Sequence, residues 1–146
     1  MNDDIIQFFQ GQTCATICCI DTFGKPYCFT CFYAFNAEDG LLYYKTSPQS
    51  NHALMMTKNP CVAGTVLPDK LNKLVVKGIQ FEATVLDDND PGIKKDTGFY
   101  HRKNPLALAM PGEVWALKID SIKMTDSTKL FGKKITWKRI PTEEGN

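Results

Sequence analysis

The side chains best suited to bind an anion lie in one short stretch of this 146-residue chain, between residues 45 and 52. Ser47 fits a helix N-cap and Pro48 the first helical position, so we expect a helix that ends near Asn59, before Pro60. The start of such a helix offers free backbone N–H groups and a partial positive charge. The polar side chains gathered there are Lys45, Thr46, Ser47, Ser50, Asn51 and His52.

Each of these residues also has an ordinary structural explanation. Ser47 can serve only as a helix cap, which stabilises a helix by about 1 kcal/mol. His52 can pack on the helix surface, and Lys45 can be a simple charge at a strand end. An anion site is therefore indicated by the combination of these residues at one junction, not by any one of them.

The six cysteines are the other residues with chemical potential. Cys28 and Cys31 form a C-x-x-C pattern, which is typical of redox and zinc sites. The pattern lies within an aromatic segment that is expected to be a strand, so the two side chains should point to opposite faces. Cys18 and Cys19 should diverge in the same way. We therefore expect small, buried, reduced thiols, not a metal site or a disulfide.

The rest of the chain is organised as short strands with turns between them. Alternating apolar residues favour strands, for example Ile79, Phe81, Ala83 and Val85 on one face. Six or seven such strands with few helices predict a mainly β protein with a closed or nearly closed antiparallel sheet. The expected strands cover residues 13–21, 27–35, 41–46, 61–67, 74–86, 114–124 and 130–140, and the expected helices cover 5–10, 48–59 and 93–103.

Length, charge and hydropathy limit the possible function classes. The length suits one domain, residues 1–146, with a barrel at about 12–140 and a polar tail at 142–146. The net charge of +1 is too small to attract nucleic acid through the overall electrostatic field of the protein. No apolar run approaches the roughly 20 residues that span a bilayer. The N-terminus lacks the basic start and apolar stretch of a secretory signal, so we expect a cytoplasmic protein without membrane or nucleic-acid partners.

The order of motifs along the chain resembles one known family. The Asp39-Gly40 turn is followed by the run Leu-Leu-Tyr-Tyr-Lys-Thr-Ser at 41–47, then Asn59-Pro60, then Val-Ala-Gly-Thr-Val at 62–66. Further matches are Gly-Ile-Gln-Phe-Glu-Ala at 78–83 and Phe-Gly-Lys-Lys at 131–134, followed by Trp137. Together these segments resemble the pyridoxamine 5'-phosphate oxidase-like family of FMN-binding split barrels, over residues 5 to 140.

The resemblance implies a six-stranded antiparallel split barrel that forms a homodimer with FMN at the subunit interface. It implies a phosphate role for Lys45, Ser50 and His52, with Thr46, Ser47 and Asn51 beside them. It also implies that the flavin ring lies against the second strand, at Phe29, Thr30, Cys31 and Phe32, and that Lys133 and Trp137 reach in from the partner chain.

The sequence departs from the oxidase pattern in its cations. The oxidase carries an Arg and a Lys on the second strand, whereas residues 27–35 hold no charge here. A Ser-Arg-Lys run at the helix start is replaced by Ser50-Asn51-His52.

Three functions remain open at this point. The first is an FMN-dependent oxidoreductase for a small-molecule substrate, with the redox chemistry supplied by the flavin. The second is a flavin- or haem-binding protein without turnover, and the third is a structural dimer without a cofactor. The fold alone does not choose among them.

Overall fold

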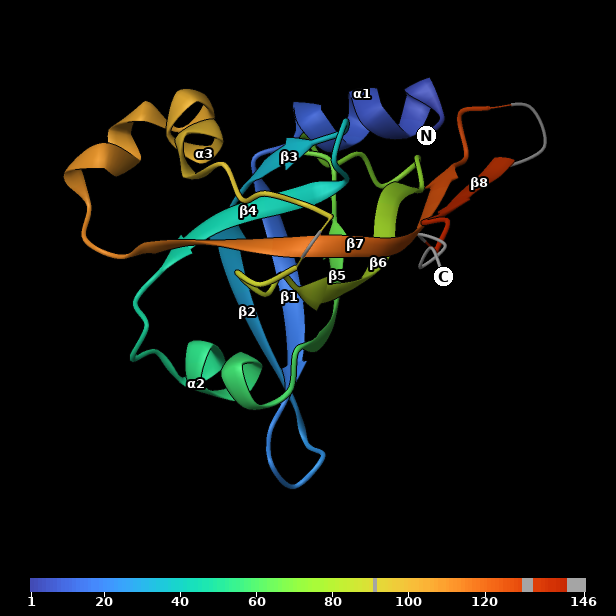
Figure 1. Ribbon diagram of the computed structural model, residues 1–146. Helices are drawn as coiled ribbons and strands as arrows, with labels where there is room; N and C mark the ends of the chain where they lie inside the picture. Colours follow the sequence, from blue (N-terminus) through green and yellow to red (C-terminus); the bar gives the residue numbers. More distant parts are fainter. Residues whose placement is uncertain (91, 130–132, 142–146) are drawn as a thin grey trace.

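A computed structural model describes residues 1–90, 92–129 and 133–141, and in this part of the chain eight strands form one antiparallel sheet. Figure 1 shows the sheet curled into a half-open barrel, with α1 near one end and α2 near the other. The elements in chain order are α1 (Asp3–Gly11), β1 (Cys14–Ile20), β2 (Pro26–Phe32), β3 (Ala34–Asn36), β4 (Leu41–Thr46), α2 (Asn51–Lys58), β5 (Cys61–Val66), β6 (Lys77–Val85), α3 (Thr97–Lys103), the 3₁₀ helix η1 (Pro105–Ala109), β7 (Glu113–Asp126) and β8 (Lys133–Lys138).

The strand order is β2-β1-β5-β6-β7-β4-β3, with β8 also paired to β7. The long strand β7 organises the barrel. One of its edges pairs with β6 over most of its length. The other edge pairs with β4 in its first half and with β8 in its second half. The sheet therefore divides at β7, which confirms the predicted mainly β, antiparallel split-barrel fold.

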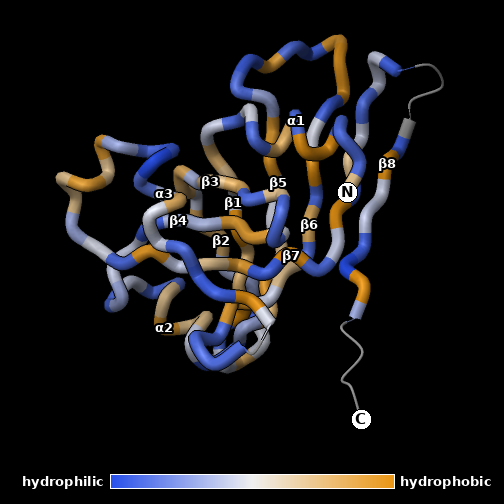
Figure 2. The backbone as a smooth tube through the Cα atoms, turned by 45° about the horizontal axis from the view of Figure 1, so that its top comes forward, coloured by the Kyte–Doolittle hydropathy of each residue, from blue (hydrophilic) through white to orange (hydrophobic). Residues whose placement is uncertain are grey.

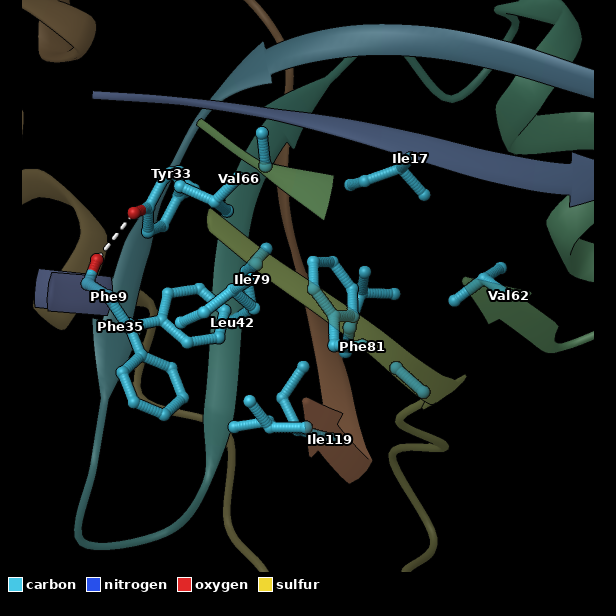
Figure 3. Close-up of a cluster of buried hydrophobic side chains, with 14 of the residues drawn as sticks. Phe9, Ile17, Tyr33, Phe35, Leu42, Val62, Val66, Ile79, Phe81 and Ile119 are labelled. Atoms are coloured by element: carbon cyan, nitrogen blue, oxygen red, sulfur yellow. Dashed lines mark hydrogen bonds between the residues drawn. The ribbon is translucent and has the colours of Figure 1, made fainter. Parts of the chain in front are cut away.

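The main core fills the concave side of the sheet. Alternation along β6 buries Ile79, Phe81 and Ala83, as the sequence predicts, and Figure 2 shows the change between apolar and polar residues along β6 and β7. Helix α1 closes one end of this core with Phe9, whose ring stacks on Phe35 with centroids 4.1 Å apart. The Tyr33 hydroxyl donates to the carbonyl of Phe9, which ties the helix to the sheet (Figure 3).

A smaller core lies on the other side of β4. Residues Leu41 to Tyr44 are all fully buried, because successive side chains of β4 enter the two cores alternately. Helix α3 covers the second core. The buried residues of this second core are Ala34, Leu41, Tyr43, Tyr100, Val114 and Ala116. The strand that leads to the predicted anion site is thus packed against a core on both faces.

Several element boundaries differ from those predicted. The strand expected at 27–35 is two strands, because β2 pairs with β1 whereas β3 leaves that ladder and pairs with β4. The helix expected from Pro48 begins at Asn51, since the side chain of Ser50, not Ser47, accepts from the N–H of Ala53. The 3₁₀ helix η1 was not predicted, and β6 begins at Lys77 instead of residue 74. Residues 130–132 of the last expected strand and the expected tail at 142–146 lie outside the described residues.

The prediction that the cysteines are small buried thiols is wrong for half of them. Cys14, Cys28 and Cys61 are exposed, whereas only Cys19 is fully buried. They point outward because their strands place alternate residues on the convex face of the sheet. Cys28 and Cys31 do lie on opposite faces, as expected.

Candidate functional site: the junction between β4 and α2

The predicted anion site is built where β4 ends and α2 begins. Thr46 is the last residue of β4 and pairs with Glu113 of β7. The chain before β7 passes closely here: Gly112 has φ +130°, and a Cβ at Gly112 would lie 2.9 Å from the Thr46 carbonyl oxygen. Ser50 then caps α2, and the N–H groups of its first turn lack intrahelical acceptors.

Three side chains of this junction meet in one hydrogen-bonded cluster. Nε2 of His52 lies 2.6 Å from Oγ1 of Thr46 and 3.1 Å from Oγ of Ser50. The two hydroxyl oxygens are 3.2 Å apart. Ser50 also donates to the Ser47 carbonyl at 2.8 Å, so its proton is used by the backbone. We call Thr46, Ser50 and His52 the junction cluster.

An aromatic ring forms one wall of the junction cluster. Phe29 of β2 stacks on the imidazole of His52, with centroids 3.7 Å apart and planes 11° apart. Partial burial lowers the pKa of His52 below its usual value of 6.5, so the imidazole is neutral at neutral pH. The junction cluster thus presents two hydroxyls and a neutral imidazole beside a helix N-terminus.

The structure does not bring Lys45 into this cluster. Lys45 precedes Thr46 in β4 and therefore points to the opposite face. Its Nζ donates to the Ala107 carbonyl of η1 at 2.7 Å and lies 3.2 Å from Nε2 of His101 in α3. Lys45 and His101 join η1 and α3 to β4, a contact that the sequence did not reveal. Ser47 and Asn51 are exposed beside the junction cluster.

The four residues proposed to face a flavin ring divide into two pairs. Phe29 and Cys31 point inward and pack against the main core. Thr30 and Phe32 point outward and are exposed. Burial raises the pKa of Cys31 to about 12, so its thiol stays protonated. Only Phe29 of this set lies against the junction cluster.

A second candidate site is a hollow of about 640 Å³ on the convex face of the sheet. Trp137, predicted to contact a cofactor from the partner chain, lies in its wall, together with Cys18 and Cys28. The other lining residues come from β1, β5, β6, β7 and β8. The side chain of Lys133, the other residue predicted to reach in from the partner, lies outside the described residues.

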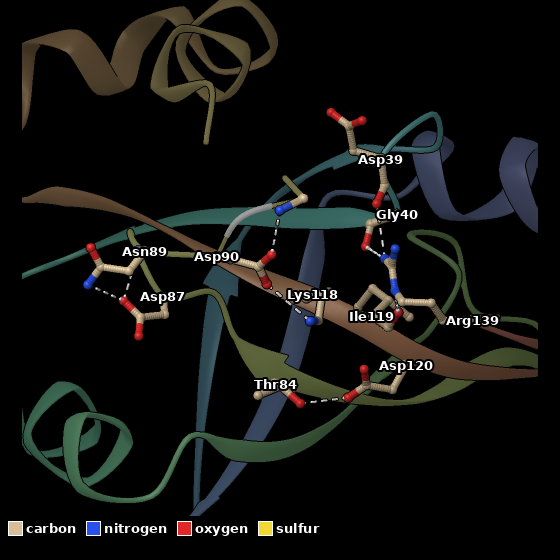
Figure 4. Close-up of polar contacts among 11 residues, drawn as sticks. Asp39, Gly40, Thr84, Asp87, Asn89, Asp90, Lys118, Ile119, Asp120 and Arg139 are labelled. Atoms are coloured by element: carbon tan, nitrogen blue, oxygen red, sulfur yellow. Dashed lines mark hydrogen bonds and ion pairs between the residues drawn. The ribbon is translucent and has the colours of Figure 1, made fainter. Parts of the chain in front are cut away.

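Arg139 has a structural role that the sequence did not predict. Its guanidinium donates to three backbone carbonyls, those of Ile119 at 2.9 Å and of Asp39 and Gly40 at 3.0 Å each (Figure 4). These bonds hold the segment that follows β8 against the β3–β4 turn. Close by, Lys118 pairs with Asp90 at 3.2 Å. The number of carbonyls bound explains why this position needs a guanidinium.

The donor set of the junction cluster limits its chemistry. Hydroxyls, a neutral imidazole and helix N–H groups can hold phosphate oxygens, but they do not form a metal site. Among the described residues, no group of three or more His, Cys, Asp or Glu side chains is placed to bind a metal ion. Within the same part of the chain, no helix has the length and apolarity that a membrane crossing requires.

Comparison with known proteins places the chain among close relatives. It is 35% identical over 138 residues to UPF0306 protein plu4501 of Photorhabdus laumondii, covering 94% of this chain and 96% of that protein. The chain belongs to the UPF0306 family. UPF0306 protein YhbP of Escherichia coli is 31% identical over 83% of this chain and 86% of its own length. No family model matches the sequence.

Solved structures with the same fold share little sequence with this UPF0306 protein. A haem-binding protein from Mycobacterium smegmatis gives a TM-score of 0.73 at 11% identity, over 90% of this chain and 55% of that one. An F420 reductase gives 0.62 at 14% identity, over 84% and 98%. An FAD-binding protein from Mesorhizobium loti gives 0.59 at 15% identity, over 84% and 92%. These likenesses establish the split-barrel fold.

Proposed function

We propose that this UPF0306 protein binds a flavin mononucleotide and that the phosphate end of the flavin sits at the junction cluster. The observation that carries the proposal is the convergence of Thr46, Ser50 and His52 on one point at the N-terminus of α2. A helix N-terminus beside the Thr46 hydroxyl is suited to a phosphate dianion. Split-barrel neighbours whose names refer to F420, FAD or haem support a flavin-type ligand at the level of the fold.

The residues present fit the phosphate with neutral donors, not with cations. Lys45 is engaged on the other face of β4, so the negative charge would be held by the helix and by hydroxyl groups. A bound dianion beside His52 would raise the pKa of the imidazole, because an adjacent opposite charge favours the protonated form. The protein would therefore bind the phosphate more tightly at lower pH.

When bound, the flavin would supply the redox chemistry, and the chain would position it and exclude water. We propose that the site is completed by a second copy of the chain in a cytoplasmic homodimer that acts on a small molecule. Exposed apolar residues support this dimer. In η1, Leu106 is 89% exposed and Leu108 is 69% exposed, on the segment that Lys45 holds against β4.

Haem binding without turnover is a second candidate. Its support is the neutral imidazole of His52, since a neutral imidazole is the form that ligates iron. To bind iron, Nε2 of His52 would have to leave the hydroxyl of Thr46.

The visible spectrum of the purified protein, followed by titration with FMN, tests the proposal. A flavin spectrum, or saturable quenching of FMN fluorescence, is expected. His52→Asn should weaken FMN binding at least tenfold, because it removes the imidazole and its stacking on Phe29. His101→Asn is the matched control, since these are the two histidines of the chain and they lie on opposite faces of β4.

The outcomes separate the candidate functions. A Soret band that His52→Asn abolishes would favour haem. A colourless protein that neither binds FMN nor quenches its fluorescence would favour the structural dimer. An equal loss of FMN affinity in both histidine variants would show that the junction cluster is not the phosphate site.

A further inference from the structure

Two cysteines that are far apart in the sequence are direct neighbours on the convex face of the sheet. In the β1–β2 ladder, Cys18 is paired with Cys28. Each of the other four cysteines faces a residue of another type, so this is the one cysteine pair of the described ladders. Both members line the hollow of about 640 Å³, with Cys28 exposed and Cys18 half-buried.

The position of the pair in the ladder brings the two side chains close together. In an antiparallel ladder, hydrogen-bonded pairs alternate with non-hydrogen-bonded pairs, in which the side chains are closer. The ladder is bonded at its two ends, by Asp21 N–H to the Lys25 carbonyl and Tyr33 N–H to the Thr13 carbonyl. Asp21 and Thr13 therefore belong to hydrogen-bonded pairs, and alternation makes every odd-numbered residue of β1 hydrogen-bonded to β2. Cys18 is even-numbered, so the pair of Cys18 and Cys28 is a non-hydrogen-bonded one.

This geometry suits a disulfide. Non-hydrogen-bonded pairs have Cα atoms about 4.5 Å apart. Disulfides span Cα separations of about 4.4–6.8 Å. We propose that Cys18 and Cys28 form a reversible disulfide that is set by low-molecular-weight thiols and disulfides such as glutathione. Nothing in this inference depends on the proposed flavin binding.

The reaction is two successive thiol–disulfide exchanges. The thiolate of the exposed Cys28 attacks one sulfur of oxidised glutathione and releases one molecule of reduced glutathione. Cys18 then gives up its proton to solvent, and its thiolate attacks the sulfur of Cys28 and releases the second glutathione. In total, two protein thiols become one disulfide, and one oxidised glutathione becomes two reduced ones.

The surroundings of Cys18 favour a disulfide that persists once formed. Burial raises the pKa of the Cys18 thiol, and the neighbouring Cys28 thiol raises it further. A thiol of high pKa is a poor leaving group, which slows reductive opening at Cys28. The disulfide would also close the hairpin between β1 and β2 and replace two thiols in the wall of the hollow with an S–S bond.

The test is to map the disulfide after oxidation. Reduced protein is incubated with oxidised glutathione, its free thiols are blocked with N-ethylmaleimide, and it is cleaved before aspartates. Cleavage before Asp21 separates the two cysteines, into fragments 4–20 and 21–38. We expect free thiols to fall from six to four and these two fragments to be joined within one chain.

Single variants locate the bond. Cys18→Ser and Cys28→Ser should each abolish the joined fragments, while Cys19→Ser and Cys31→Ser should retain them. If a serine variant fails to fold, Cys18→Ala replaces it, and tandem mass spectrometry of the wild-type fragments assigns the sulfurs directly. Six free thiols after oxidation, a bond through Cys19 or Cys31, or linkage only between chains would each overturn the proposal.

Discussion

Gly64 of β5 lies opposite Phe81 of β6, with the aromatic ring directly over the glycine. A Cβ at Gly64 would lie 2.2 Å from Cζ of Phe81 and less than 3 Å from both Cε atoms. The ring cannot swing into solvent, because Phe81 is only 3% exposed and packs 5.8 Å from the ring of Phe9. Gly64→Ala must therefore displace a core side chain.

The size and the sign of the effect follow from two opposing contributions. Overpacking a tight core costs about 1–3 kcal/mol. Replacing glycine by alanine in a strand would by itself stabilise the protein by about 0.5–1 kcal/mol. The net loss should be about 0–2.5 kcal/mol, which lowers the Tm by up to several degrees in a domain of this size.

Urea unfolding of four proteins tests the reasoning: wild type, Gly64→Ala, Phe81→Leu and the double variant. The cost of Gly64→Ala should shrink in the Phe81→Leu background, with a coupling energy of about 0.5–3 kcal/mol. Gly11→Ala is the control, because nothing lies within 4 Å of the added Cβ. A more stable Gly64→Ala protein, or an equal cost in both backgrounds, would refute the packing argument.

Three further changes have defined outcomes. Ser50→Ala should lower the free energy of unfolding by about 1 kcal/mol through loss of the α2 cap. Ser47→Ala should have little effect. Equal losses of stability in urea unfolding of the two variants would contradict the observed cap. Arg139→Ala should lower the free energy of unfolding by about 1–3 kcal/mol, because three carbonyls lose a charged donor. Arg139→Lys should not restore this stability. Full rescue by lysine would show that the positive charge alone matters. His52 has a pKa below its unfolded value of 6.5, so its contribution to stability is present above pH 6.5 and is lost as the pH falls through the folded pKa. The free energy of unfolding should therefore decline less between pH 7 and pH 5 in His52→Asn than in the wild-type protein. An equal decline in the two proteins would show that His52 is not buried as described.

Local patterns predicted the mainly β, antiparallel sheet and the place of the junction, whereas the split barrel came from the family resemblance. Alternation of apolar residues marks the strands, and Pro60 ends the helix after β4. The details of the junction depend on longer-range contacts. Ser47 is the cap that the sequence predicts, and only the path of the chain after Thr46 decides that Ser50 caps α2 instead. The direction of Lys45 follows from which face of β4 meets the main core, and local patterns cannot supply this for a strand buried on both faces.

The cysteine pair depends on the register of the first hairpin, which the sequence did not determine. The strands expected at 13–21 and 27–35 centre the hairpin on residue 24, whereas the observed ladder is centred on Phe23 and pairs Cys18 with Cys28. The contact of Arg139 with the β3–β4 turn had no local signal, because it joins segments about 100 residues apart.

The discrimination between FMN and riboflavin tests the central claim most directly, because the two differ only in the phosphate. Isothermal titration should show FMN bound at least tenfold more tightly than riboflavin by the wild-type protein. The Ser50→Ala/His52→Asn double variant should lose most of this preference while keeping its affinity for riboflavin. Equal affinities in the wild-type protein, or a preference that survives in the double variant, would contradict the assignment of the junction between β4 and α2 as the phosphate site.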